Sequence, residues 1–155
     1  MNYEIDEISE ELTDAVSEAF ENMFFADIEN CLDLDAIEVK KESLVISVDT
    51  LKPFMGKVGL VIDKEYSEEI VMEMTGGDVE EISNSMVNDA LSEIGNTIVG
   101  RFLSRIVPED EEFSLGFPEC NPWEDGNENS VKSENRRLFA LEMEETCVYC
   151  ILSKN

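Results

Sequence analysis

The chain has 155 residues, 43% of them hydrophobic, and we predict one domain over residues 1–155 because this length buries a single core. It carries 37 acidic and 11 basic residues, a formal net charge of −26, so binding to nucleic acid or to an anionic membrane surface is not expected. No apolar run approaches the length of a membrane span and the first residues are acidic, which favours a cytoplasmic location.

The first half begins with an amphipathic pattern and then changes to an alternating one. Ser9 is the expected cap of the opening helix, and Gly76-Gly77 is a strong C-terminal stop for a second helix. The predicted elements in chain order are a helix over 9–25, strands over 37–40, 43–48 and 54–62, and a helix over 66–74.

The longest predicted helix opens the second half, at residues 88–107, with Asn84 or Ser85 as its cap and Pro108 at its end. After it we expect strands over 113–117, 137–143 and 146–152, with a polar loop or irregular hairpin over 121–135. These elements predict an α+β fold, in which two long amphipathic helices pack on a largely antiparallel sheet of about six strands.

The long helix places four residues of unusual composition opposite its apolar stripe. Asp89, Glu93, Asn96 and Gly100 fall within a sector of roughly 60°, so they face outward when the stripe is buried. An ordinary solvated face would mix Lys and Glu, whereas this one carries two carboxylates, one amide and bare backbone. Gly100 either lets another surface approach the helix or permits close packing within the chain.

The opening helix contains a related stretch. Asp14-Ala15-Val16-Ser17-Glu18 matches Asp89-Ala90-Leu91-Ser92-Glu93, and the same alignment places Glu21 at the position of Asn96. The match suggests an internal duplication with halves of about 1–78 and 79–155.

Cys147 and Cys150 have a spacing seen in metal and redox sites. They lie in a predicted strand, however, where residues three apart point to opposite faces, and the chain has no histidine. We therefore predict free thiols and no metal site on this chain.

The motif Asp89-x3-Glu93-x2-Asn96, followed after 21 residues by Pro118, resembles the signature of the CheC/CheX/FliY family of chemotaxis phosphatases, with a spacing one residue shorter than the family pattern. Gly100-Arg101 and residues 56–60 and 74–77 are also similar to the CheX-like branch. Because Glu21 replaces the amide in the first copy, the chain resembles the single-site, CheX-like members.

This resemblance implies hydrolysis of the aspartyl phosphate on a CheY-type response regulator. Asn96 would orient the attacking water, Glu93 would pair with a lysine of the regulator, and Asp89 and Gly100 would contact the partner. No cofactor is expected on this chain, and Mg²⁺ would be held by carboxylates of the partner receiver domain. The resemblance also implies a homodimer. The alternative is a non-catalytic module that binds a response regulator or a flagellar-switch component, since the FliM middle domain resembles this fold.

Overall fold

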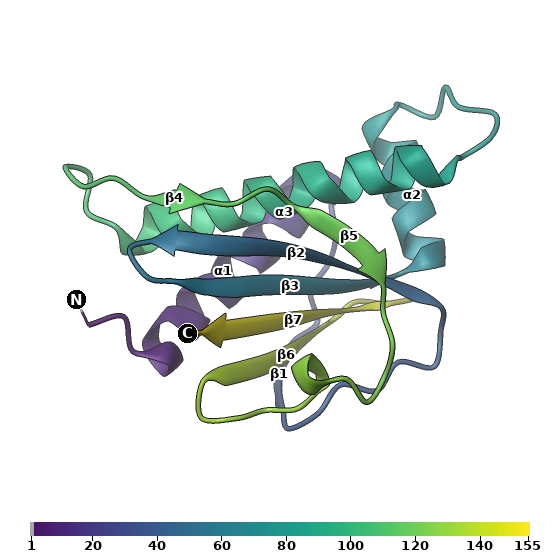
Figure 1. Ribbon diagram of the computed structural model, residues 1–155. Coiled ribbons are helices and arrows are strands. Elements are labelled where there is room, and N and C mark those ends of the chain that lie inside the picture. The colour runs from purple at the N-terminus through teal and green to yellow at the C-terminus, as the bar shows by residue number, and fades with distance from the viewer. Residues whose placement is uncertain (1) are drawn as a thin grey trace.

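The computed structural model describes residues 2–155 as two layers, with long helices against one face of a seven-stranded sheet (Figure 1). This arrangement confirms the α+β class and the antiparallel sheet, with seven strands rather than about six. The elements are α1 (Ile5–Phe24), β1 (Asn30–Leu34), β2 (Ser43–Lys52), β3 (Gly56–Asp63), α2 (Lys64–Met74), α3 (Asn84–Ile106), β4 (Ser114–Leu115), β5 (Glu119–Pro122), the short helix η1 (Glu128–Ser130), β6 (Arg136–Glu142) and β7 (Cys147–Lys154).

The main core lies between the helices and the sheet. Both α1 and α3 bury one apolar face, and they run antiparallel beside each other, as Figure 1 shows. The largest fully buried side chains include Phe20 of α1 and Phe102 of α3, while β2 and β3 supply branched residues from below. Packing of the apolar face of α3 against the sheet therefore determines which residues of this helix face outward.

The strand order β1-β6-β7-β3-β2-β4, with β5 also paired to β2, has a near-symmetric form. The hairpin of one half (β2-β3) lies beside the hairpin of the other (β6-β7), and each hairpin is flanked by a strand from the opposite half. A duplicated unit of one helix and three strands would give this order. The boundary between the two halves stays a prediction.

A second, smaller core covers the face of the sheet away from the helices. Ile37, Val61, Leu138 and Ile151 are buried there, and Trp123 packs against them. The indole N–H of Trp123 donates to Asp125 at 2.9 Å. Residues 121–135, expected to form a polar loop, thus contribute part of β5, the helix η1 and a cover for the sheet.

Several expected boundaries were wrong. Ser9 is not a cap, because α1 begins at Ile5 and Ser9 is buried within it, where its hydroxyl donates to the Ile5 carbonyl. The cap of α3 is Ser83, whose Oγ accepts from the N–H of Met86 at 3.2 Å. The expected strands at 37–40 and 113–117 become a loop and the two-residue β4, while the unpredicted β1 pairs with β6.

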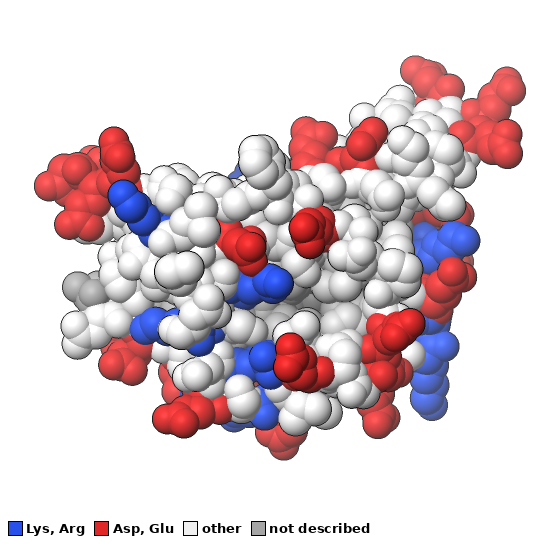
Figure 2. Space-filling model, in the orientation of Figure 1, with Lys and Arg blue, Asp and Glu red and all other residues white. Residues whose placement is uncertain are grey.

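Acidic side chains gather on the loops at the two ends of α3, where Figure 2 shows them in red. These loops are residues 75–83 and 107–113. None of the helices in residues 2–155 is both long and apolar enough to cross a lipid bilayer.

Candidate functional site

The structure places Asp89, Glu93, Asn96 and Gly100 together on the outward side of α3, and we call these four residues the exposed strip. The first three are exposed and Gly100 is half-buried. Within residues 2–155, no hydrogen bond or ion pair involves the side chains of Asp89, Glu93 or Asn96. The two carboxylates and the amide are thus available to an external partner.

The strip is held in place by the residues that alternate with it. Ile94 and Ile98 are fully buried on the opposite side of the helix. Gly95 lies directly over β2, and a Cβ at this position would be 2.9 Å from Cγ1 of Ile46 and 3.3 Å from Cγ2 of Val48. This close approach fixes the rotation of α3, and with it the direction in which Asn96 points.

Gly100 has the opposite environment. A Cβ added there would meet nothing within 4 Å. Close packing within the chain, one of the two explanations the sequence allowed, therefore does not account for this glycine. It leaves bare helix backbone one turn beyond Asn96.

A shallow hollow of about 570 Å³ lies beside the strip, between α1 and α3. Asn96, Thr97 and Gly100 line it from α3, Asn22 lines it from α1, and Phe113 lines it from the loop before β4. A second amide, a bare backbone segment and an aromatic ring thus line the same hollow as Asn96.

The acids of the first copy are bound within the protein. Arg105 of α3 donates to Glu11 at 2.8 Å, to Glu18 at 3.2 Å and to Asp14 at 3.4 Å, all on α1. These hydrogen bonds and charges raise the pKa of the Arg105 guanidinium above its usual value, and the hydrogen bond that Arg105 donates to Glu11 is the largest cause. The fork of Arg105 thus joins the two helices.

The two related stretches consequently differ in whether their acidic side chains are free to bind a partner. Asp14 and Glu18 are paired with Arg105, whereas Asp89 and Glu93 have no partner in the described chain. Glu21, which stands at the position of Asn96, is exposed and anionic. Of the two matched stretches in residues 2–155, only the one on α3 has unpaired acids at its first two motif positions and an amide at the third.

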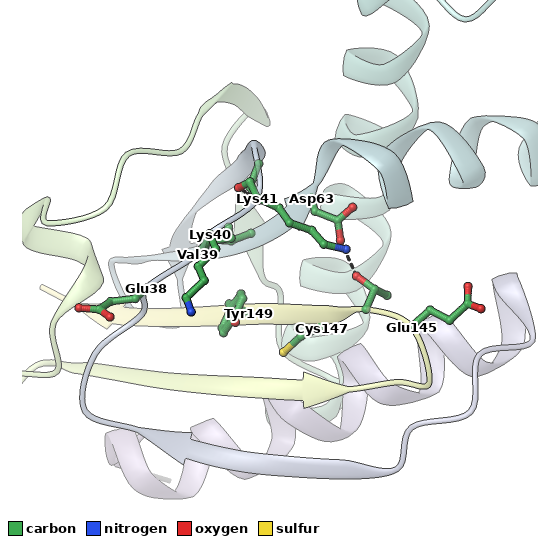
Figure 3. Close-up of a pocket in the computed structure, with 11 residues that line it drawn as sticks. Glu38, Val39, Lys40, Lys41, Asp63, Glu145, Cys147 and Tyr149 are labelled. Carbon is green, nitrogen blue, oxygen red and sulfur yellow. Dashed lines mark hydrogen bonds between the residues drawn. The ribbon is translucent and has the colours of Figure 1, made fainter.

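A different cavity, of about 440 Å³, lies on the sheet face away from the helices and is drawn in Figure 3. Tyr149 and Cys147 line it from β7, and burial is the main cause that raises the pKa of Tyr149 to about 12 and that of the Cys147 thiol above its usual value. Asp63 is already engaged, because it accepts from the N–H of Tyr66 at 2.7 Å and from the hydroxyl of Thr146. Cys147 and Asp63 are thus not free nucleophiles or ligands, and the remaining acids of the lining, Glu38 and Glu145, are exposed.

The two cysteines of β7 do not converge. Cys147 lines the outer cavity, whereas Cys150 is fully buried in the core beneath the helices, as strand alternation requires. Burial raises the pKa of the Cys150 thiol well above its usual value. Among residues 2–155, no three acidic or cysteine side chains are grouped so that they could hold a metal ion.

Sequence reasoning missed two residues that line the hollow beside the strip, Asn22 and Phe113. Asn22 and Phe113 reach the hollow only through tertiary packing, so no local pattern indicates them. Arg101, which follows Gly100 in the segment that resembles the CheX-like branch, was assigned no role. The residues three and four positions away from it on each side include no acid, although 37 acids occur in the chain.

The comparisons with known proteins agree on one fold. A CheX from Vibrio vulnificus superposes with a TM-score of 0.77 at 12% identity, covering 96% of this chain and 99% of that one. A CheX–CheY complex with BeF3 and Mg²⁺ from Borrelia burgdorferi gives 0.70 at 15% identity, covering 93% and 95%. A FliM–SpeE complex from H. pylori gives 0.55 at 14% identity, covering 97% and 85%.

The sequence itself matches one family model. No curated protein matches the chain. The model for "Chemotaxis phosphatase CheX" matches residues 44–137, well over half of the chain, and this segment contains the whole exposed strip. The chain therefore belongs to the CheX family of chemotaxis phosphatases.

Proposed function

We propose that this protein accelerates hydrolysis of the aspartyl phosphate on a CheY-type response regulator, and that Asn96 orients the attacking water. The observation that carries the proposal is the unpaired, exposed amide of Asn96 with the unpaired carboxylate of Glu93 one turn before it. The family match and the CheX–CheY complex among the structural relatives support the choice of partner.

The chemistry suits an amide. Hydrolysis of an acyl phosphate needs a water held in line with phosphorus and little covalent help from the protein. The Asn96 carboxamide both donates and accepts hydrogen bonds, so it can fix such a water without adding negative charge beside the phosphoryl group.

A carboxylate at this position would oppose the reaction. Two like charges about 4 Å apart repel by about 4 kcal/mol at an effective dielectric constant of about 20. Glu21 would introduce this repulsion if its helix docked in the same way, so the first copy is unsuited to the chemistry.

The remaining residues of the strip are assigned to docking. Glu93 pairs with a lysine of the receiver domain and sets the register of α3, while Asp89 and the bare backbone at Gly100 contact the partner surface. Mg²⁺ belongs to the receiver, where carboxylates and the phosphoryl group bind it. The homodimer implied by the resemblance stays a prediction that sedimentation of the purified protein tests.

The test measures phosphate release from a phosphorylated CheY-type receiver with Mg²⁺. Asn96→Ala should lower kcat by about a hundredfold, since a misplaced water loses its attack geometry. Asn30→Ala is the matched control, because it removes an exposed amide on β1, outside the hollow, and should leave kcat unchanged. Glu93→Ala should act mainly through weaker binding. Equal kcat values for wild type and Asn96→Ala would refute the mechanism.

The fold similarity to a chain of the FliM–SpeE complex supports a second candidate, a module that binds a response regulator or a switch component without catalysis. Tight binding to the phosphorylated receiver with no change in the lifetime of its phosphate would favour this function.

A further inference from the structure

The arginines of this acidic chain are nearly all engaged internally. Arg105 and Arg137 form ion pairs with acids of α1, and Arg136 donates to Ser153 and to the carbonyl of Glu128. Arg101 is the exception, since its guanidinium donates to no group within residues 2–155. A delocalised cation with a rigid fork of donors is thus left free in a protein of net charge −26.

Arg101 is also placed beside the strip. It is half-buried and lines the same hollow as Asn96 and Gly100. Among the described residues that line the hollow, Glu18 is the only acid, and its carboxylate is already paired with Arg105 at 3.2 Å. The free positive charge of Arg101 therefore faces the hollow without a competing internal partner.

The acid and the cation lie on opposite sides of Asn96 along the axis of α3, so the exposed strip and Arg101 together have a polarity. Glu93 lies three residues before Asn96 and Arg101 lies five residues after it, so acid and cation are separated by about 12 Å along the helix axis. A partner with a cation at one side of its pocket and a carboxylate at the other side would fit only one orientation of this helix.

The chemistry of the proposed partner supplies the carboxylate. A site that binds Mg²⁺ together with a phosphoryl group contains carboxylate ligands, so its surroundings carry negative charge. Two acidic surfaces repel each other at long range. A local cation at the edge of the hollow offsets this repulsion where the surfaces meet.

We infer that Arg101 is a second docking anchor, which forms an ion pair with a carboxylate on the receiver domain beside its phosphorylation pocket. The inference rests on the proposed function for the identity of the partner. Glu93 and Arg101 together bracket Asn96 and fix both the direction and the register of α3 on the receiver. Arg101 is a positioning residue and takes no part in the chemical step.

Binding measurements test the anchor directly. The probe is a CheY-type receiver loaded with beryllofluoride and Mg²⁺, titrated with the full chain by calorimetry. Arg101→Gln should weaken binding about tenfold at low salt, and the ratio to wild type should shrink toward one in roughly 0.5 M NaCl. Lys40→Gln is the matched control, since it removes the same charge from an exposed site on the opposite face of the sheet and should change binding less than twofold.

Turnover and charge reversal separate docking from folding. Arg101→Gln should raise KM and leave kcat unchanged, with a melting temperature equal to that of wild type. Arg101→Glu should bind more weakly still, and one acidic-to-lysine substitution on the receiver should restore its binding. That rescue would identify the partner carboxylate.

Three outcomes overturn the inference. Binding of Arg101→Gln equal to wild type, while Asn96→Ala abolishes turnover, refutes the anchor and leaves the proposed function standing. A fall in melting temperature that parallels the loss of binding assigns Arg101 a structural role instead. If no acidic-to-lysine substitution on the receiver restores the binding of Arg101→Glu, the proposed ion pair is refuted. If Asn96→Ala retains full activity, the catalytic proposal fails and the binding ratio still decides the role of Arg101.

Discussion

The two glycines on α3 allow one chemical change to be tested in two opposite environments. Gly100→Ala adds a methyl group that meets nothing within 4 Å. Alanine is favoured over glycine in a helix by about 1 kcal/mol, so the free energy of unfolding should rise by about this amount. For a chain of this length, such a gain corresponds to an increase in melting temperature of about 2–4 °C.

Gly95→Ala should have the opposite effect. Its Cβ would be 2.9 Å from Cγ1 of Ile46, an atom close to the strand backbone that has little freedom to move. Overpacking of this kind costs about 1–3 kcal/mol, which outweighs the gain in helix propensity and leaves a net loss of about 1 kcal/mol. Thermal unfolding followed by circular dichroism measures both changes.

The same Gly100→Ala variant should bind the receiver less well although it is more stable. If the partner approaches the bare backbone one turn beyond Asn96, a single methyl group should raise KM about tenfold, equivalent to about 1.4 kcal/mol, with kcat unchanged. A more stable variant with wild-type KM would show that the partner does not approach Gly100. A less stable variant would contradict the open environment from which the prediction starts.

Other predictions address the pairing of the two helices and the acidic surface. Arg105→Gln removes three exposed ion pairs and should lower the stability by about 1 kcal/mol, a loss that diminishes in 1 M NaCl when melting curves are compared. Glu21→Asn, made in an Asn96→Ala background, should restore no phosphatase activity, because the neighbouring acids of α1 stay bound to Arg105; activity near wild type would refute this account. The pKa of Glu69 is raised, mainly by burial and then by the nearby Glu145, so the folded state holds this proton to higher pH than the unfolded state. Stability therefore falls as the pH rises from the ordinary glutamate pKa of about 4.3 through the raised pKa of Glu69 in the folded state. Glu69→Gln should have a higher melting temperature than wild type at pH 7, and no such advantage below a pH of about 4.3.

The long helices were predictable from the sequence because their apolar periodicity extends over many turns. The expected helix at 88–107 corresponds to α3, and its outward sector contains Asp89, Glu93 and Asn96 as the wheel indicates. Its start was displaced because three adjacent residues, Ser83 to Ser85, are all favourable caps, and only the backbone conformation selects Ser83.

The edge of the sheet was not predictable, because its pairing is not local. Ile37 and Val39 alternate as in a strand, yet Ile37 is buried in the outer core and the N–H of Val39 donates to Asp125 from a distant loop. The strand β1 instead pairs with β6, which lies in the other half of the sequence. Alternation reports burial on one side and does not report a partner strand.

The distinction between Gly95 and Gly100 was equally hidden. Both glycines lie on one helix, and a glycine in a helix does not by itself show whether it serves packing or docking. The wheel places Gly100 outward, but only the position of Ile46 on β2 shows which glycine the fold requires. Close approach is a property of two elements together, so one element's sequence does not reveal it.

The same reasoning explains why two helices of similar sequence would have different functions. In an antiparallel pair, the side chains that face the neighbouring helix become part of the helix interface, and Arg105 of α3 engages Asp14 and Glu18 of α1 in this way. Asp89 and Glu93, at the matching positions of α3, meet no such cation. Arg105 of α3 thus holds the acids of α1 in the contact between the two helices. The acids of α3 itself, Asp89 and Glu93, stay free to bind a partner. Glu21, which matches Asn96 in the sequence alignment, is exposed, so the fold does not require an amide at that position.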